Sequence, residues 1–390
     1  MDTRMSQDEV IELTRELVRT PSLNPPGDTR DCAKIILKKF EKEHIDAEII
    51  EGKKGFCNVV ARLPGKGKGK VLLLNGHIDV VPPGENWTVD PFGAEIREGK
   101  IYGRGTSDMK SGIACMMAAM IAYKRTRTSF NGEIIFMGAA DEETGSEWGT
   151  VHLLQKGVGK GADFAIVSEP TSLRVELGNR GLRWIDIIIN GKACHAGRPQ
   201  IGINAIHYAA KLIEAIYSMR FTDRNDIFEI PTPSISVTQI HGGAKVNIIP
   251  DRCDLALDRR LILGETTETV MAELKGVIDP ILKEEKDLKI AVKMRPNYWD
   301  PYLMSEDEPI VRAVIEAAKQ VTGKRPEIRA KAGCTDGSHL FHLGGTPTVL
   351  FGPGDETFSH KADECVPIQN LSVGTGVCLS VFNQLFGQSI

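Results

Sequence analysis

The segment Gly76–Gly84 carries His77 and Asp79 directly after the apolar run 71–75. Because side chains alternate along a strand, residues two positions apart at a strand end point to the same face. One of the pair can therefore ligate a metal ion while the other orients it by a hydrogen bond. A histidine near a strand end is more often an ordinary buried polar residue, so this interpretation depends on the acids that follow.

Four further segments, each at an expected strand end or in a loop, supply acids and a second histidine: Asp108, Glu142 with Glu143, Glu169, and His360. In an open α/β sheet, such strand ends border one crevice. We therefore expect these side chains to gather around the first pair.

The chemistry that suits this set is hydrolysis at two metal ions. Two cations about 3.5–4 Å apart can clamp an attacking water and the scissile oxygen, and an anionic ligand between them relieves their repulsion. Asp108 is the single acid suited to the bridging position. Imidazole and carboxylate ligands suit two Zn²⁺ ions, with Co²⁺ or Mn²⁺ as substitutes. Because Glu142 and Glu143 are adjacent, one can bind metal while the other takes the proton of the water.

Composition limits the classes of protein to consider. The 390 residues are long enough for two domains, and a net charge of −4 gives no sign of nucleic-acid binding. The eight cysteines are scattered without a C-x-x-C pair, which argues against a zinc knuckle or a disulfide scaffold. No apolar run approaches the ~18 residues of a membrane span, and the first residues lack a signal-peptide pattern. We therefore expect a cytoplasmic protein that acts without a membrane.

Elements that could position the candidate residues follow from the periodicity. Helices are expected at 6–19, 31–43 and 111–124, and strands at 47–50, 59–63, 71–75, 132–140 and 163–167. Ser6 and Glu9 form a capping-box pattern at the start of the first helix. The alternation of strands and helices predicts a mixed, mostly parallel α/β sheet with helices on both faces.

The pattern changes from residue 182 onward. Strands at 184–189, 234–240, 247–257 and 288–294 and helices at 203–217 and 266–282 give the order β-α-β-β-α-β of a ferredoxin-like module. A helix at 308–321, a strand at 346–352 and a helix at 370–386 then resume the first pattern. The sequence thus predicts a discontinuous α/β domain, residues 1–180 and 295–390, with an inserted α+β domain, residues 181–294.

The metal-site motifs, in this order and over nearly the whole chain, resemble the M20 metallopeptidase family, which includes acetylornithine deacetylase, succinyl-diaminopimelate desuccinylase, aminoacylase-1 and glutamate carboxypeptidase. The sequence as a whole resembles the deacetylase/desuccinylase branch more than the aminoacylase branch. The resemblance implies that His77 and Glu169 bind one metal, Glu143 and His360 the other, and Asp108 both. It also implies that Asp79 orients His77, that Glu142 is the general base, and that the Asp108–Met109 peptide bond is cis.

The inserted domain resembles the lid of that family, which is also its usual dimerisation module, so the resemblance implies a homodimer. His195, within Gly191–Pro199, matches the lid histidine that polarises the scissile carbonyl and stabilises its oxyanion. Asn247 and Arg260 match lid residues that bind the carboxylate or amide of the substrate, for which the forked arginine is well suited. Arg180, and Thr335 and Gly337 of a late glycine loop, are further candidate substrate-binding residues.

The implied activity is removal of an acyl group from an N-acyl amino acid, which releases a carboxylate and a free amino acid. Desuccinylases carry Thr-Ser-Asp-Gly-Arg in the late loop, whereas this chain has Cys334–Ser338, so the cation is missing at Ser338. Leu182 also replaces a small hydroxyl residue. Both departures disfavour succinyl-diaminopimelate and leave acetylornithine, another N-acyl amino acid or a dipeptide open. A metallo-dipeptidase or carboxypeptidase, and a non-catalytic binding protein that retains the fold, are the alternatives.

Overall fold

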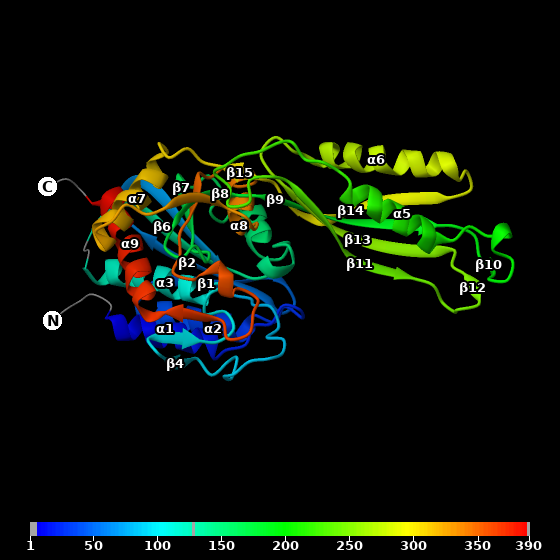
Figure 1. The fold of residues 1–390 in the computed structure, drawn as a ribbon. Coiled ribbons are helices and arrows are strands. Elements are labelled where there is room, and N and C mark those ends of the chain that lie inside the picture. Colours follow the sequence, from blue (N-terminus) through cyan, green and yellow to red (C-terminus); the bar gives the residue numbers. More distant parts are fainter. Residues whose placement is uncertain (1–5, 127–128, 388–390) are drawn as a thin grey trace. The chain divides into compact units, whose positions relative to one another are not determined.

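The computed structural model describes residues 6–126 and 129–387. Two compact units divide the chain: unit 1 contains Met1–Asn179, Leu303–Lys331 and Thr335–Ile390, and unit 2 contains Arg180–Tyr302 and Ala332–Cys334. In Figure 1 the colours of unit 1 run from blue to teal and again from orange to red, because the chain leaves this unit and returns to it.

A nine-stranded mixed sheet forms the centre of unit 1, with the order β1-β2-β6-β3-β7-β17-β8-β15 and with β16 also paired to β8. Its strands are β1 (Asp46–Lys53), β2 (Phe56–Pro64), β3 (Gly67–His77), β6 (Asn131–Ala139), β7 (Phe164–Val167), β8 (Val175–Asn179), β15 (Tyr302–Leu303), β16 (Ile328–Lys331) and β17 (Thr348–Leu350). The central strands β6, β3, β7 and β17 are parallel, and β1 and β2 are antiparallel. Strands buried on both faces require uninterrupted apolar runs, as β3, β6 and β7 have.

Helices cover both faces of this sheet. They are α1 (Gln7–Val18), α2 (Arg30–Lys42), α3 (Lys110–Thr126), α4 (Thr150–Gln155), α7 (Pro309–Thr322), α8 (Asp336–His342) and α9 (Ile368–Phe386). Phe136 of β6 packs 5.2 Å from the ring of Phe40 in α2. Its neighbour Ile135 joins Leu153 of α4 and Leu340 of α8 in a cluster on the other face, as the alternation of a strand requires. Helix α3 is buried along most of its length, which explains why it has no polar face.

The candidate residues are positioned by the carboxyl ends of the parallel strands. β3 ends at His77, β6 at Ala139 and β7 at Val167, and these ends lie at the same edge of the sheet. A small separate sheet, with the order β18-β5-β4, pairs residues 365–367 with residues 100–102. Its strands are β4 (Glu95–Arg97), β5 (Lys100–Tyr102) and β18 (Cys365–Pro367).

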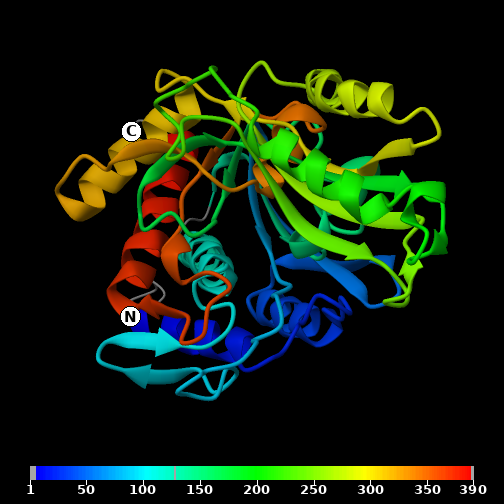
Figure 2. The same cartoon turned by 45° about the vertical axis from the view of Figure 1, so that its right-hand side comes forward.

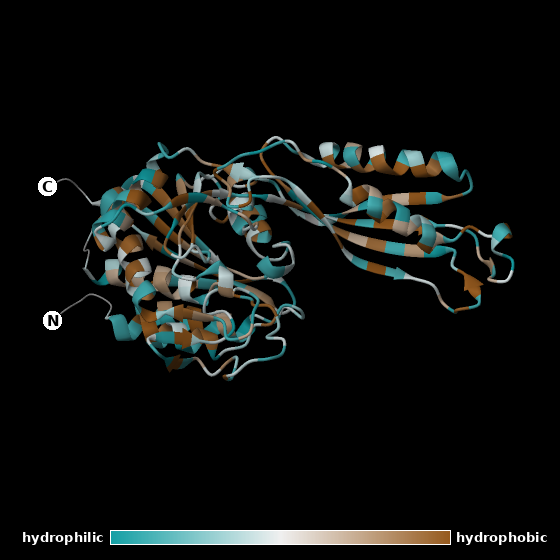
Figure 3. Cartoon of the chain, in the orientation of Figure 1, coloured by the Kyte–Doolittle hydropathy of each residue, from teal (hydrophilic) through white to brown (hydrophobic). Residues whose placement is uncertain are grey.

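Unit 2 has its own antiparallel sheet, with the order β11-β13-β9-β14. Its elements are β9 (Gly181–Asn190), α5 (Ala205–Tyr217), β11 (Ser234–Gly242), β13 (Arg252–Leu261), α6 (Thr267–Glu284) and β14 (Lys289–Trp299), and a ribbon of β10 (Cys194–His195) with β12 (Ile248–Ile249) extends it. Both helices lie on one side of the sheet (Figures 1 and 2). Brown apolar and teal polar residues alternate along α6 in Figure 3, as expected for a helix with one buried face. This order is the predicted ferredoxin-like one, and the predicted fold class is confirmed.

One predicted strand is divided in the structure. Residues 247–257 were expected to be continuous, whereas β12 ends at Ile249 and β13 begins at Arg252. Pro250 lies between them, and a proline cannot donate a hydrogen bond to a strand ladder. The division separates the β10–β12 ribbon from the main sheet of unit 2.

All eight cysteines are free thiols. Among the described residues, none of the helices combines the length and the apolar character that crossing a membrane would require.

Candidate metal centre

Asp108 lies between the two predicted histidine ligands. Its Oδ1 is 3.0 Å from His77 Nε2, and its Oδ2 is 3.5 Å from His360 Nε2. His360 Nε2 is in turn 3.1 Å from Glu143 Oε2. The ligand atoms of His77, Asp108 and Glu143 all lie within 4.8 Å of one another, close enough to hold a metal ion. An acid that presents one oxygen to each histidine has the geometry of a ligand shared by two metals.

Glu169 and Glu142 interact electrostatically with the residues of this group. Glu169 is buried, and its Oε1 has no hydrogen-bond partner within the described part of the chain. Burial, followed by the charge of Asp108, raises the pKa of Glu169 to about 8. Burial also raises the pKa of Glu142 well above its ordinary value, and the charges of Glu169 and Glu143 add to this although His77 opposes it. Divalent cations would partner the orphaned oxygen and offset the repulsion. The imidazole and carboxylate donors therefore fit the two metal ions that the sequence predicts.

The contacts of Asp79 differ in detail from the predicted ones. His77 Nδ1 lies 2.9 Å from the main-chain oxygen of Asp79, whereas the nearest carboxylate oxygen is 3.7 Å away. That carboxylate accepts a hydrogen bond of 2.8 Å from Asn24 and bonds of 3.3 Å from the main-chain N–H groups of Glu142 and Glu143. Asp79 therefore contacts the histidine mainly through its backbone and holds the two glutamates through its side chain.

The glutamates sit on a single 3₁₀ turn, η1 (Glu142–Thr144), directly after β6. Asp141 precedes it with φ of 68°, a left-handed conformation that short polar residues tolerate better than most. The Asp141 side chain accepts hydrogen bonds from Thr144 Oγ1 and, at 3.0 Å, from the N–H of Trp148. These hydrogen bonds hold the turn in one conformation, with Glu142 and Glu143 next to the other candidate ligands.

Three residues that the sequence analysis did not select interact with the centre, Asn24 and Glu364 by hydrogen bonds and Lys331 through its charge. Lys331 is buried, donates to the carbonyl of Pro170 at 3.2 Å, and forms an ion pair with Glu356 at 3.1 Å. Burial alone would lower the pKa of Lys331, but the surrounding carboxylates raise it above its ordinary value. Lys331 could have been noticed in the sequence, because a lysine in a short strand that is expected to be buried needs acidic partners. Nothing in the sequence around Asn24 distinguishes it.

Thr335 and Gly337 form hydrogen bonds within unit 1. Thr335 Oγ1 donates to Asn179 Oδ1 at 2.9 Å and accepts from the N–H of Gly337 at 3.1 Å, which caps α8. The neighbouring Asp336 accepts hydrogen bonds from Ser146 and Thr150. The loop is therefore anchored on the chain that follows η1.

The other predicted substrate residues lie in unit 2. Arg180 is buried and donates to the carbonyl of Thr232 at 2.9 Å and to Ser234 Oγ at 3.1 Å. Arg260 pairs with Asp258 at 2.7 Å, and its Nη1 lies 3.8 Å from Cys334 Sγ.

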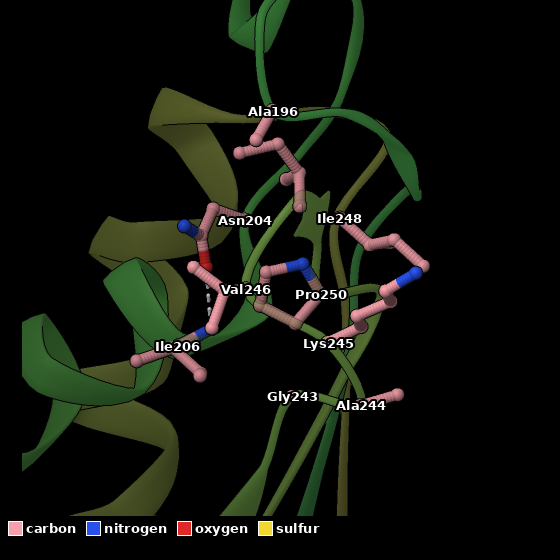
Figure 4. Close-up of a pocket in the computed structure, with 10 residues that line it drawn as sticks. Ala196, Asn204, Ile206, Gly243, Ala244, Lys245, Val246, Ile248 and Pro250 are labelled. Carbon is pink, nitrogen blue, oxygen red and sulfur yellow. Dashed lines mark hydrogen bonds between the residues drawn. The ribbon is translucent and has the colours of Figure 1, made fainter.

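His195 and Asn247 lie together at the β10–β12 ribbon. The His195 side chain is exposed, with Nδ1 accepting from the N–H of Gly197 at 3.0 Å. The carbonyl of Asn247 accepts from the N–H of Ala196 at 3.0 Å. Beside them is a pocket whose lining includes Ile206 and the fully exposed Val246 (Figure 4). Its lining is apolar apart from Asn204 and Lys245 and contains no acid or histidine, so this pocket is not a metal site.

An α/β fold with histidines and acids gathered at its strand ends defines a metal-dependent hydrolase. Residues 73–384 match the model of the peptidase family M20/M25/M40. The match covers most of the chain, so the chain belongs to this family and is a metal-dependent amide hydrolase, as expected. The Asp108–Met109 peptide bond is cis, also as expected.

Individual relatives agree with this assignment. The chain is 28% identical over 389 residues to a succinyl-diaminopimelate desuccinylase of Dechloromonas aromatica, which covers 97% of this chain and 99% of that protein. A tripeptidase from Staphylococcus aureus has a similar fold, with a TM-score of 0.79, 24% identity and coverage of 98% of this chain and 99% of the other. So does a dinuclear metal binding peptidase from Bacillus subtilis, with a TM-score of 0.71, 19% identity and coverage of 96% and 98%.

Proposed function

We propose that this chain hydrolyses the amide bond of an N-acyl amino acid at a centre that holds two zinc ions. The observation that carries the proposal is the position of Asp108 between His77 and His360, with Glu142 in the same cluster. His77 and Glu169 would bind one metal, Glu143 and His360 the other, and Asp108 both. Cobalt or manganese can replace zinc with this donor set.

When bound, the metal ions supply Lewis acidity and make hydroxide available at neutral pH. The proton chemistry belongs to Glu142. Its carboxylate takes a proton from the attacking water and delivers it to the nitrogen of the leaving amine. The burial that raises the pKa of Glu142 makes it a stronger base than an exposed glutamate. Asp79 keeps this residue and Glu143 in place through their N–H groups.

Unit 2 would supply the groups that recognise the substrate. We assign His195 to the oxyanion of the scissile carbonyl, and Asn247, Arg260 and Arg180 to the carboxylate or amide of the substrate. Thr335 and Gly337 of unit 1 are further proposed substrate-binding residues. Unit 2 would act as the lid and as the dimerisation domain of a cytoplasmic homodimer. The exposed position of His195 in the ribbon supports a role outside its own fold.

The identity of the acyl group is argued from the residues that would bind it. A desuccinylase relative favours this branch of chemistry. Ser338, however, is a buried, uncharged residue of α8, and Leu182 is buried in β9. Neither supplies a cation to pair with a second carboxylate, so we propose an acyl group without one, such as acetyl.

A substrate panel tests the proposal. Zinc-loaded protein would be given N-acetyl, N-succinyl and N-formyl amino acids and a set of dipeptides, with a chelated sample as control. Release of free amino acid from the acyl substrates, abolished by the chelator, is expected. Turnover of dipeptides alone would identify a peptidase with the same centre, and no turnover by protein that binds two metal ions would indicate a binding protein.

A further inference from the structure

The side chain of Glu364 connects two loops that carry predicted metal ligands. It is fully buried, and its Oε1 accepts hydrogen bonds from the main-chain N–H groups of Gly105 at 3.0 Å, Ser107 at 2.8 Å and Asp108 at 3.0 Å. Its other oxygen pairs with Arg104. One carboxylate oxygen therefore holds three main-chain N–H groups of the segment 105–108, which ends at the proposed shared metal ligand. Charge-assisted hydrogen bonds of this kind are the stronger ones in proteins.

The same residue is joined through the chain to the second histidine, because His360 precedes it by four residues. The main-chain oxygen of Glu364 accepts from the N–H of Gly103 at 2.9 Å, and the next residue, Cys365, pairs with Tyr102 in the β18–β5 ladder. The loop of His360 is thus fastened to the loop of Asp108 by backbone as well as by side chain.

Further contacts hold the rest of the His360 loop. Asp363 accepts hydrogen bonds from the N–H of Thr88 at 2.8 Å and from its hydroxyl at 3.0 Å. Ser107 Oγ donates to the carbonyl of Asp355 at 2.8 Å. His360 has φ of 63° and Asp363 has φ of 55°, and non-glycine residues keep such conformations only where their surroundings impose them.

The charge of Glu364 is balanced locally. Arg104 is also buried, lies 5.3 Å from the ring of Trp87, and donates to the carbonyl of Pro83 at 3.2 Å. Because the pair is neutral overall, Glu364 can remain ionised beneath the cluster without adding to its negative charge. Within the described part of the chain, the hydrogen bonds of its carboxylate go to backbone N–H groups and to Arg104, so we treat it as a positioning group and not as a metal ligand.

We propose that Glu364 sets the spacing between Asp108 and His360 and thereby the affinity of the metal centre. This inference depends on the dinuclear centre proposed above. It predicts that metal binding is weakened when residue 364 offers no acceptor to these N–H groups, whether or not the ion pair with Arg104 is present.

Two double variants separate these contributions without leaving a buried charge unpaired. Arg104→Met/Glu364→Gln keeps an oxygen that can accept the three N–H groups, and Arg104→Met/Glu364→Met removes it. Full-length protein would be stripped with a chelator and titrated with Co²⁺, with both the dissociation constant and the visible absorption of the bound ion recorded. We expect the methionine pair to bind Co²⁺ about 10- to 100-fold more weakly than the glutamine pair, which is the range found for outer-sphere partners of metal ligands, and to show an altered spectrum.

Equal affinity and an unchanged spectrum in the two variants would overturn the role of Glu364. If the methionine pair does not fold, Glu364→Asp is compared with the wild type instead. The shorter side chain of aspartate moves the acceptor away from the N–H groups and keeps the charge that pairs with Arg104. Wild-type protein that binds no Co²⁺ would overturn the metal centre itself, and the role of Glu364 with it. The two failures are therefore distinguishable.

Discussion

The acids of the centre have different pKa shifts because they have different neighbours. Burial acts to raise the pKa of Asp108, but the hydrogen bond and charge of His77 hold it well below its ordinary value. Burial raises the pKa of Asp79 to about 6, although the charge of His77 and the hydrogen bond from Asn24 oppose it. Burial raises the pKa of Glu142 well above its ordinary value, and within the described part of the chain Glu142 is not one of the three side chains whose ligand atoms lie within 4.8 Å of one another. The opposite shifts of Asp108 and Glu142 fit the ligand and base roles proposed for them, although the raised pKa of Glu169 shows that a proposed ligand can also be shifted upward.

Replacement of Glu142 by glutamine tests its role as the base. Glu142→Gln keeps the size of the side chain but cannot accept the proton. We expect kcat to fall by about 100- to 10,000-fold, the usual contribution of a general base, while the bound metal stays at the wild-type amount. Steady-state kinetics and elemental analysis measure the two quantities.

Glu147→Gln is the matched control for that variant, because Glu147 lies five residues further on and is exposed. It should leave both quantities unchanged. Loss of metal from Glu142→Gln would instead make Glu142 a ligand and leave Glu143 as the candidate base.

Asp79→Asn tests whether the Asp79 carboxylate holds the glutamates or the histidine. An asparagine would turn one N–H donor toward the N–H groups that the carboxylate now accepts. We expect kcat to fall by about 10- to 100-fold with little change in Co²⁺ affinity, since His77 keeps its contact with the backbone. Asp163→Asn is the control, because Asp163 also accepts a backbone hydrogen bond, from the N–H of Val71 in β3, six residues before His77. If affinity falls and kcat at saturating metal does not, the carboxylate orients His77.

At the scale of elements, the long periodic segments could be predicted and the short ones could not. The capping box of Ser6 and Glu9 starts α1 as expected. Strands of three residues such as β5 and β18 carry too few residues to show a period, and they form only because Ile101 meets Val366 from far along the chain. Glu364 was missed for the same reason, since its partners at 104–108 are adjacent only in space. His77, Glu143 and Glu169 were selected as candidate ligands because each lies at or just after the end of a strand, whereas the candidates Asp108 and His360 lie in loops.

The approach of α3 to the end of β7 depends on Gly112. A Cβ added there would lie 2.1 Å from the carbonyl oxygen of Ser168, the residue before Glu169. Gly112→Ala should therefore push the start of α3, and Asp108 with it, away from Glu169. We expect the free energy of unfolding to fall by about 1–3 kcal/mol, as for other overpacked sites, and Co²⁺ affinity to fall as well. Urea denaturation and metal titration measure these effects.

Gly276 provides the matched helix position in α6, because a Cβ there would meet no atom within 4 Å. Gly276→Ala should raise the free energy of unfolding by roughly 0.5–1 kcal/mol, since alanine restricts the unfolded chain more than glycine does. An unfolding midpoint of Gly112→Ala equal to that of the wild type would show that α3 accommodates a methyl group and that its spacing from β7 does not matter.

At the scale of the whole molecule, the two units have separate hydrophobic cores. The core of unit 2 joins strand residues such as Ile187 to helix residues such as Leu212 and Leu274, and it includes only residues of that unit. All the predicted metal ligands belong to unit 1. Metal binding should therefore stabilise one unit and leave the other unchanged.

The four tryptophans allow the units to be followed separately, since Trp87 and Trp148 belong to unit 1 and Trp184 and Trp299 to unit 2. A ligand at 100 times its dissociation constant stabilises the state that binds it by about 2.7 kcal/mol. In protein with Trp184→Phe and Trp299→Phe, we expect zinc at that excess to raise the urea midpoint of tryptophan fluorescence relative to chelated protein. In protein with Trp87→Phe and Trp148→Phe, which reports on unit 2, the midpoint should not move. Equal shifts in both would mean that the two cores unfold as one cooperative structure, and no shift in either would mean that the cluster in unit 1 does not bind zinc.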